Sequence, residues 1–355
     1  MKIKEVRISK ENLELTRPYS IAYKSVDSVD NCIVEIILEN GTSGLGAANP
    51  SKQVVGEDVN DTVELLKAHD FGWLVGRDIR EMHQLCFEVM QHFPKRPGVR
   101  ATLDIALHDL FTKQLGVPLV KYLGQKHKAL PTSITIGIKG VEETVEEAKE
   151  YVGRGFKYIK VKTGVSLEED IERLSKIHEL YKKDIVLRVD ANQGYTKLQL
   201  EDFYYKTLSM DLELIEQPLP ADAIEEYKKL PSAVKELVAL DETVVSPYDA
   251  LRLASKPSAG GIFNIKLMKC GGISCAQEIA AIASGANIKL MWGCNDESII
   301  SIAAALHAAF SSANTHYIDL DGSFDLARDV AKGGFYLKDG VMSLTDKPGL
   351  GVEKL

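Results

Sequence analysis

The sequence predicts an α/β protein, a TIM-type (β/α)7β barrel preceded by an α+β unit. From about Pro131 onward, eight short β-rich runs alternate with amphipathic helical patterns, which is the rhythm of a closed parallel barrel. Before that point, segments of period 2 are followed by helical segments. An open doubly wound sheet is the alternative. No G-x-G-x-x-G follows the early strands and no P-loop is present, so nucleotide binding has no support.

The composition is that of an ordinary globular protein, and 355 residues suffice for one large and one smaller domain. The net charge of −8 argues against a general affinity for nucleic acid or anionic membranes. No apolar stretch is long enough to span a bilayer, and the first residues lack the apolar core of a signal sequence. Five widely spaced cysteines form neither a disulfide framework nor a zinc pattern. We therefore expect a cytoplasmic protein.

The N-terminal part begins with alternating segments, IKEVRIS and CIVEIILEN, and continues with the glycine-rich GTSGLGAANP. These patterns predict antiparallel strands joined by turns. Helical periodicity follows over residues 59–69 and 99–115, and the second helix is closed by Gly116 and Pro118. Strands followed by helices indicate an α+β unit of about 120 residues.

Polar residues close most of the barrel strands. The strand runs are TSITIGI, YIKVKTG, IVLRVDANQG, LELIEQP, LVALDET, GIFNIKLMK, KLMWGC and YIDLDG. The residues that we take as the last polar position of each run, with Gly293 standing in the seventh, are Thr135, Lys162, Asp190, Glu216, Asp241, Lys266, Gly293 and Asp319. Neighbouring positions are 25 to 28 residues apart, one strand–helix unit each time, so these residues occupy equivalent places around the barrel. The carboxyl ends of barrel strands form the active face.

Three carboxylates, Asp190, Glu216 and Asp241, close the third, fourth and fifth strands. Carboxylates brought together repel one another, and a hard divalent cation removes that repulsion. A ligand set of oxygens without Cys or His suits Mg²⁺, or Mn²⁺ as a substitute. The alternative is that these carboxylates cap strands or pair with Lys160 and Lys266.

Two lysines, Lys162 and Lys266, close the second and sixth strands and therefore face each other across the barrel mouth. Strand alternation turns Ile159 and Val161 toward the helices and Lys160 and Lys162 inward. A substrate carboxylate held on the metal would present its α-carbon between the two amines. One lysine could remove the α-proton and the other could return it from the opposite face. The alternative is a structural network of ion pairs.

The chain resembles the enolase superfamily and, within it, the muconate-lactonizing subgroup. The segments that carry the resemblance are KVKTG, VDANQGY, EQP, DET, NIKLMKCGGI and KPGLGV. The resemblance implies a capping domain over residues 1–125, completed by about 325–355, and a catalytic barrel over 126–324. It implies the following roles: Lys162 and Lys266 as the acid/base pair; Asp190, Glu216 and Asp241 as metal ligands; Lys160 on the substrate carboxylate; Asn192 near the metal; Thr135 as a substrate contact.

Within the subgroup the chain is similar to dipeptide epimerases such as L-Ala-D/L-Glu epimerase. The segment IDLDG places Asp319 and Asp321 at the end of the eighth strand, where two carboxylates could clamp the ammonium group of a dipeptide. The resemblance implies inversion of the α-carbon of the C-terminal residue in an Ala-Xaa dipeptide. The alternative for Asp321 is a simple turn with Gly322.

The second residue of the dipeptide stays open. Lys24 falls where similar enzymes carry an Arg for a glutamate side chain, and as a point charge it could still meet a carboxylate. The alternative is that Lys24 is a solvated loop residue. Asp296, in GCNDES, could repel an acidic residue or bind a cationic or polar one. One rival function is that of an N-acylamino-acid racemase or o-succinylbenzoate synthase. Another is a catalytically silent metal-binding barrel. The resemblance also allows a homo-oligomer.

Overall fold

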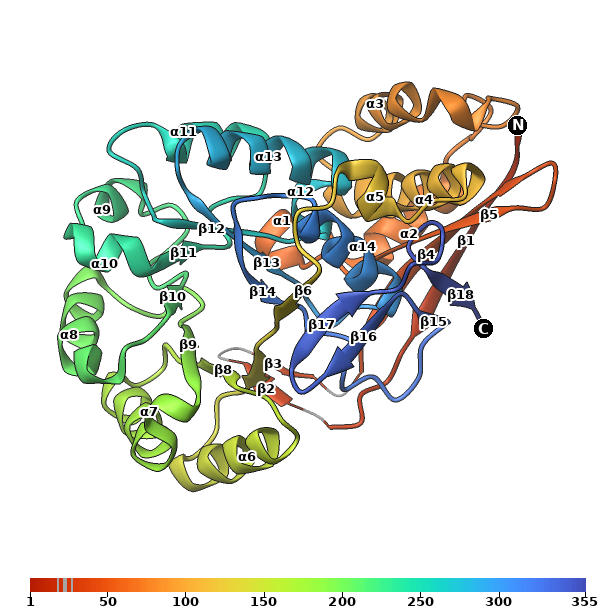
Figure 1. The fold of residues 1–355 in the computed structure, drawn as a ribbon. Coiled ribbons are helices and arrows are strands. Elements are labelled where there is room, and N and C mark those ends of the chain that lie inside the picture. The colour runs from red at the N-terminus through yellow and green to blue at the C-terminus, as the bar shows by residue number, and fades with distance from the viewer. Residues whose placement is uncertain (18, 22–23, 27) are drawn as a thin grey trace.

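The structure is a computed structural model that describes residues 1–17, 19–21, 24–26 and 28–355, with no side chains described over 18–27. Figure 1 shows an N-terminal sheet with its helices beside a larger barrel, and both chain termini on the side of the N-terminal sheet. None of the helices in the described part of the chain has the length and apolar character needed to cross a membrane.

The N-terminal part is an antiparallel sheet of order β1-β4-β5, made of β1 (Ile3–Asn12), β4 (Asp30–Leu38) and β5 (Ser43–Ala48). A separate ribbon pairs β2 (Tyr19–Ile21) with β3 (Lys24–Val26). The helices are α1 (Lys52–Val55), α2 (Val59–Ala68), α3 (Met82–His92), α4 (Pro97–Leu115) and α5 (Leu119–Leu123), with a 3-10 turn η1 (Ile79–Glu81). The helices predicted over 59–69 and 99–115 are thereby confirmed within two residues at each end.

Helix α4 packs directly on β5 because two glycines face it. A Cβ on Gly44 would lie 2.3 Å from the carbonyl oxygen of Ala106, and one on Gly46 would lie 1.9 Å from that of Thr102. The glycine-rich segment of the sequence therefore serves close helix–sheet packing as well as turns.

The barrel consists of eight strands, each hydrogen-bonded in parallel to the next in chain order. They are β7 (Ile134–Ile136), β8 (Tyr158–Lys162), β9 (Val186–Asp190), β10 (Leu214–Glu216), β11 (Val238–Leu240), β12 (Ile262–Ile265), β13 (Lys289–Gly293) and β14 (Thr315–Asp319). A parallel bridge between Thr132 and Ile318 brings the first strand to the last, so the barrel is nearly closed. A doubly wound sheet would reverse its strand order, and this alternative is excluded.

Helices cover the barrel between successive strands (Figure 1). They are α6 (Val141–Gly153), α7 (Leu167–Tyr181), α8 (Lys197–Thr207), α9 (Ile224–Lys228), α10 (Ser232–Leu237), α11 (Pro247–Ala254), α12 (Leu267–Cys270), α13 (Ile273–Gly285) and α14 (Ile299–Phe310), with 3-10 turns η2 (Lys182–Asp184) and η3 (Leu208–Met210). The predicted (β/α)7β barrel is confirmed.

The barrel interior has an apolar layer beneath a charged one. Leu214, Ala239, Ile262, Met291 and Tyr317 form a buried cluster. Two residues further along their strands, on the same inward side, come Glu216, Asn264 and Asp319. The apolar cluster lies toward the N-terminal ends of the strands, where the buried Arg188 is the register partner of Leu214, and most of the charged side chains gather at the carboxyl ends.

The C-terminal segment contacts both parts of the molecule. A small sheet of order β16-β17-β6 joins β16 (Phe335–Lys338) and β17 (Val341–Leu344) to β6 (Ala129–Pro131), and β15 (Ala331–Gly333) pairs with β18 (Val352–Lys354). Lys354 forms an ion pair with Glu35 at 2.6 Å, and the amide of Leu350 donates to Asp109 at 2.8 Å. The division at residues 125 and 324 stays a prediction.

Helix α4 also contacts the barrel through a buried carboxylate. Asp104 accepts a hydrogen bond from the amide of Ile273 at 2.6 Å and so caps α13. The ring of His108 lies 3.4 Å from the same carboxylate. The helix dipole favours a carboxylate at a helix N-terminus, so the contact of Asp104 with α13 stabilises the packing of α4 against the barrel.

Candidate active site

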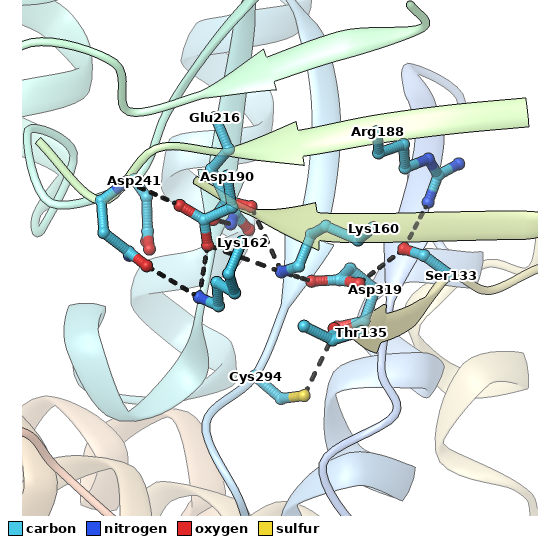
Figure 2. A network of polar contacts seen from close by, with 12 residues as sticks. Ser133, Thr135, Lys160, Lys162, Arg188, Asp190, Glu216, Asp241, Cys294 and Asp319 are labelled. Carbon is cyan, nitrogen blue, oxygen red and sulfur yellow. Dashed lines mark hydrogen bonds and ion pairs between the residues drawn. The ribbon is translucent and has the colours of Figure 1, made fainter. Parts of the chain in front are cut away.

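Strand register places two of the three predicted metal ligands side by side. Lys162 is the register partner of Asp190, and Asp190 is the partner of Glu216. Asp241 follows directly after β11, the next strand. Figure 2 shows the three carboxylates pointing toward one another at the mouth of the barrel.

The two predicted acid/base lysines reach this cluster from strands four apart in the eight-strand order, since Lys162 ends β8 and Lys266 directly follows β12. The ammonium of Lys162 is 2.5 Å from Oδ2 of Asp190 and donates to Asn192 Oδ1 at 3.0 Å. The ammonium of Lys266 is 2.8 Å from Oδ2 of Asp241. The backbone amide of Asn192 also donates to Asp190 at 3.0 Å, which holds that carboxylate in place. Sequence spacing therefore predicts correctly which charged residues the fold brings together.

The charge balance of the cluster favours a bound cation. Burial and the neighbouring Asp190 raise the pKa of Glu216 to about 8. Burial opposes the charge on Lys266, but Asp241 and Glu216 outweigh it and raise the pKa of Lys266 well above its usual range. The neighbouring Glu242 is half-buried, and its Oε2, which is itself shielded from solvent, has no hydrogen-bond partner among the described residues. Carboxylate oxygens in excess of their local partners fit a hard divalent cation such as Mg²⁺.

Lys160 lies deeper than Lys162 and is almost fully buried. It forms a short ion pair with Asp319 and a second with Glu216 at 3.3 Å (Figure 2). Ser133 donates to Asp319 at 2.5 Å, and Arg188 in turn donates to Ser133 at 2.9 Å. Ion pairs between Lys160 and the carboxylates, the alternative considered from the sequence, are therefore present in this structure.

Asp321 and Thr135 are brought together at the rim of the barrel. The backbone amide of Thr135 donates to Asp321 Oδ2 at 2.8 Å. Burial and the charge of Asp319 raise the pKa of Asp321 to about 7. The carbonyl of Asp321 also accepts from Phe324 at 2.8 Å, so the residue makes a turn while its carboxylate lines the cavity.

A cavity of about 1150 Å³ opens between the barrel mouth and the N-terminal part. Lys162 and Lys266 line it from the barrel, and Asn49 and Val54 line it from the capping side. Asp296 also lines the cavity, and its backbone carbonyl accepts from the side chain of Asn49 at 2.8 Å. Lys24 belongs to β3, but its side chain lies outside the described residues.

Sequence reasoning assigned no role to Asn264 and Lys269, two buried residues that contact the carboxylates of Glu216 and Asp241. Asn264 donates to Glu216 Oε1 at 2.7 Å, and a Cβ at Gly293 would lie 2.7 Å from the Asn264 amide oxygen, so Gly293 leaves room for this contact. Lys269 forms a short ion pair with Asp241. Lys269 follows Lys266 by three residues, and this spacing brings two side chains to the same face of a helix. The sequence patterns do not predict the one-turn helix α12 directly after the strand, so this spacing could not be used.

Comparisons with known proteins agree with this geometry. Residues 3–124 match the family model "Mandelate racemase / muconate lactonizing enzyme, N-terminal domain", and residues 143–354 match "Enolase C-terminal domain-like". The chain is 52% identical to an L-Lys-D/L-Arg epimerase of Desulforapulum autotrophicum, over 100% of both chains. It is 34% identical to an L-Ala-D/L-Glu epimerase of Clostridium acetobutylicum, over 99% of both chains.

A solved structure has the same fold throughout. The dipeptide epimerase of Methylococcus capsulatus, complexed with Mg and the dipeptide L-Arg-D-Lys, superposes with a TM-score of 0.97, is 50% identical, and covers 99% of each chain. These relatives are epimerases, and the prediction that the chain is an isomerase is confirmed. The chain belongs to the enolase superfamily, in the family of mandelate racemase and muconate lactonizing enzyme.

Proposed function

We propose that the protein is a Mg²⁺-dependent dipeptide epimerase that inverts the α-carbon of the C-terminal residue by a two-lysine reaction. The observation that carries this proposal is that Lys162 and Lys266 pair with different carboxylates of the cluster and come from strands four apart in the eight-stranded barrel, which supports a position on opposite faces of a substrate. A base on each face of one carbon is what inversion by removal and return of a proton requires. The mechanism is an inference from this geometry.

The cation, held by Asp190, Glu216 and Asp241, would act as a Lewis acid that stabilises negative charge on the substrate carboxylate. The protein's own residues transfer the protons and bind the substrate carboxylate. One lysine, as the neutral amine, takes the α-proton on its Nζ while the other, protonated, donates a proton to the opposite face. Lys160 stands between Glu216 and Asp319, where its ammonium can meet a substrate carboxylate.

Asp321 is the residue that we assign to the ammonium group of the dipeptide. Its carboxylate lines the cavity and accepts from the amide of Thr135, and because a carboxylate has about four acceptor sites it can also accept from a substrate ammonium. Asp319 is engaged by Lys160 and Ser133, and it supports Asp321 mainly through its charge.

We further propose that the substrate carries cationic side chains, as in Lys-Arg dipeptides. Among the described residues that line the cavity, acidic side chains outnumber basic ones. Asp296 lines the cavity, and we assign to it the attraction of a cationic second residue. The names of the relatives that share about half of their residues with this chain favour Lys and Arg over the Ala-Xaa dipeptide expected from the sequence.

A substrate panel tests the proposal. The purified protein with Mg²⁺ is incubated in D₂O with L-Lys-L-Arg, L-Ala-L-Glu, L-Ala-L-Leu and N-succinyl-L-Arg, and inversion is followed by NMR. We expect the highest kcat/KM with L-Lys-L-Arg. Preference for L-Ala-L-Leu or L-Ala-L-Glu would refute the proposed preference for cationic side chains but would still support dipeptide epimerase activity. Turnover of N-succinyl-L-Arg alone would refute the dipeptide assignment.

A further inference from the structure

Lys269 is a buried lysine whose ammonium is fully satisfied by fixed acceptors. It lies on α12, immediately behind the strand end that carries Lys266, and only 4% of it is exposed. Its Nζ makes short contacts with both Oδ1 and the backbone carbonyl of Asp241, and it donates to the carbonyl of Asn264 at 3.0 Å. An ammonium has three protons, and these three acceptors use all of them.

Lys266 contacts the same carboxylate in a different way. Its ammonium lies 2.8 Å from Oδ2, the other oxygen of Asp241, and its side chain lines the cavity. Lys269 is not among the described residues that line this cavity. Oδ1 of Asp241 thus contacts Lys269, which is also anchored to backbone carbonyls, whereas Oδ2 contacts Lys266, which lines the cavity.

Asp241 depends on such an anchor because it lies beyond the end of β11. Its amide donates to the side chain of Gln217 at 2.8 Å, which fixes the backbone but not the carboxylate. Gln217 itself is buried and adopts a positive φ of 35°, so the surrounding hydrogen bonds hold a locally strained backbone. The carboxylate of Asp241 is kept from rotating by Lys269, which binds its Oδ1.

We propose that Lys269 is a positioning residue for Asp241: it holds Oδ1 and so presents Oδ2 to the bound cation. The inference rests on the proposed metal site but not on the identity of the substrate. A residue that orients a ligand in this way commonly changes metal affinity by about 10- to 100-fold when it is removed.

The competing explanation is that Lys269 is only a counter-ion for a buried carboxylate cluster. The two explanations predict changes of opposite sign in the affinity for the cation when Lys269 is replaced by an uncharged residue. Removing a positive charge beside a cation site strengthens cation binding by Coulomb's law, whereas removing an anchor for a ligand weakens it. Lys266 offers a matched control, because Lys266→Met removes the same charge from the same carboxylate without removing the anchor.

The test is a titration of the substrate-free proteins with Mn²⁺, followed by electron paramagnetic resonance of the free ion. We expect Lys269→Met to bind Mn²⁺ about 10- to 100-fold more weakly than the unmodified protein. Lys269→Arg should recover part of the loss, and Lys266→Met should bind equally or more tightly. Lys269→Met binding as tightly as the unmodified protein, or more tightly, would overturn the proposal.

Folding of each variant is checked by circular dichroism and thermal unfolding. Should Lys269→Met fail to fold, Lys269→Gln keeps one donor for Oδ1 and is judged by the same sign of the change in Mn²⁺ affinity. No dipeptide is present in the titration, so the result does not depend on the proposed reaction. Failure of the epimerase proposal would appear separately, as absence of turnover in a protein that binds the cation.

Discussion

Lys162 and Asp190 are direct partners in the parallel register of β8 and β9, and their charged groups meet at 2.5 Å. The amine that we assign to proton transfer is therefore positioned by the sheet itself, next to the carboxylate of the adjacent strand that we assign to the metal. Side chains on strands are placed more precisely than those on loops, which suits a reaction that requires a base at a fixed distance from one carbon.

Removal of the cation should abolish the activity. Asp190, Glu216 and Asp241 are the only groups that we assign as protein ligands, and a carboxylate-only site binds Mg²⁺ reversibly. We expect EDTA to stop inversion of L-Lys-L-Arg and either Mg²⁺ or Mn²⁺ to restore it. Asp190→Asn should weaken cation binding by more than the roughly 100-fold typical of residues that only orient a ligand. Full activity in the presence of EDTA would contradict the metal assignment.

Asp321→Asn should impair substrates that have a free ammonium group. A hydrogen bond between charged groups contributes about 1.5–3 kcal/mol, which corresponds to a roughly 10- to 100-fold increase in KM for L-Lys-L-Arg. Steady-state kinetics measure this increase. Asp346→Asn, an exposed position outside the cavity, is the control for the same chemical change. An unchanged KM in Asp321→Asn would remove this residue from the substrate site.

Asp296→Asn should change the choice of the second residue. We expect kcat/KM for L-Lys-L-Arg to fall by about 10-fold, because one long-range charge attraction is lost, while kcat/KM for L-Lys-L-Leu stays within a factor of two. The comparison with Asp321→Asn separates the two roles, since that variant should affect both dipeptides equally. Equal losses in Asp296→Asn would mean that it does not determine specificity.

His307 should make stability depend on pH in mildly acidic solution. Burial lowers its pKa to about 4, and the neutral ring accepts a hydrogen bond from the amide of Val120 at 2.9 Å. Between pH 6.5 and 4 the folded protein binds fewer protons than the unfolded chain, so the free energy of unfolding falls as the pH is lowered. The loss amounts to about 3 kcal/mol over this window.

Urea unfolding of the His307→Gln variant measures this contribution. The variant should be less stable at neutral pH but should lose less stability between pH 6.5 and 4. His316→Gln changes an exposed histidine and should keep the slope of the unmodified protein. A slope that is identical in all three proteins would exclude His307 as its source.

The sequence suffices to predict the barrel and its charged mouth because both follow from simple periods. A spacing of one strand–helix unit locates Asp190, Glu216, Asp241 and Lys266, and strand alternation turns Lys160 and Lys162 inward. These residues meet because parallel strands in chain order fix the register of their neighbours.

Other features of the site depend on contacts that periodicity does not contain. Lys269 reaches Asp241 only because α12 begins at the residue after Lys266. Lys160 is buried against Asp319 only because three strands come together around this ion pair. Arg188 supports it indirectly from inside the barrel, since it donates a hydrogen bond to Ser133. Oligomeric state and cellular compartment are likewise not set by these patterns and stay predictions.

The most direct test of the two-base reaction is hydrogen exchange at the C-terminal α-carbon in D₂O. The unmodified protein, Lys162→Ala and Lys266→Ala are each incubated with L-Lys-L-Arg and, separately, with L-Lys-D-Arg, and deuterium uptake is measured by mass spectrometry. We predict exchange and inversion of both diastereomers by the unmodified protein. Each variant should lose inversion and exchange only one diastereomer, the opposite one in the two variants. Inversion that survives in either variant, or loss of the same diastereomer in both, would contradict a reaction with one lysine on each face.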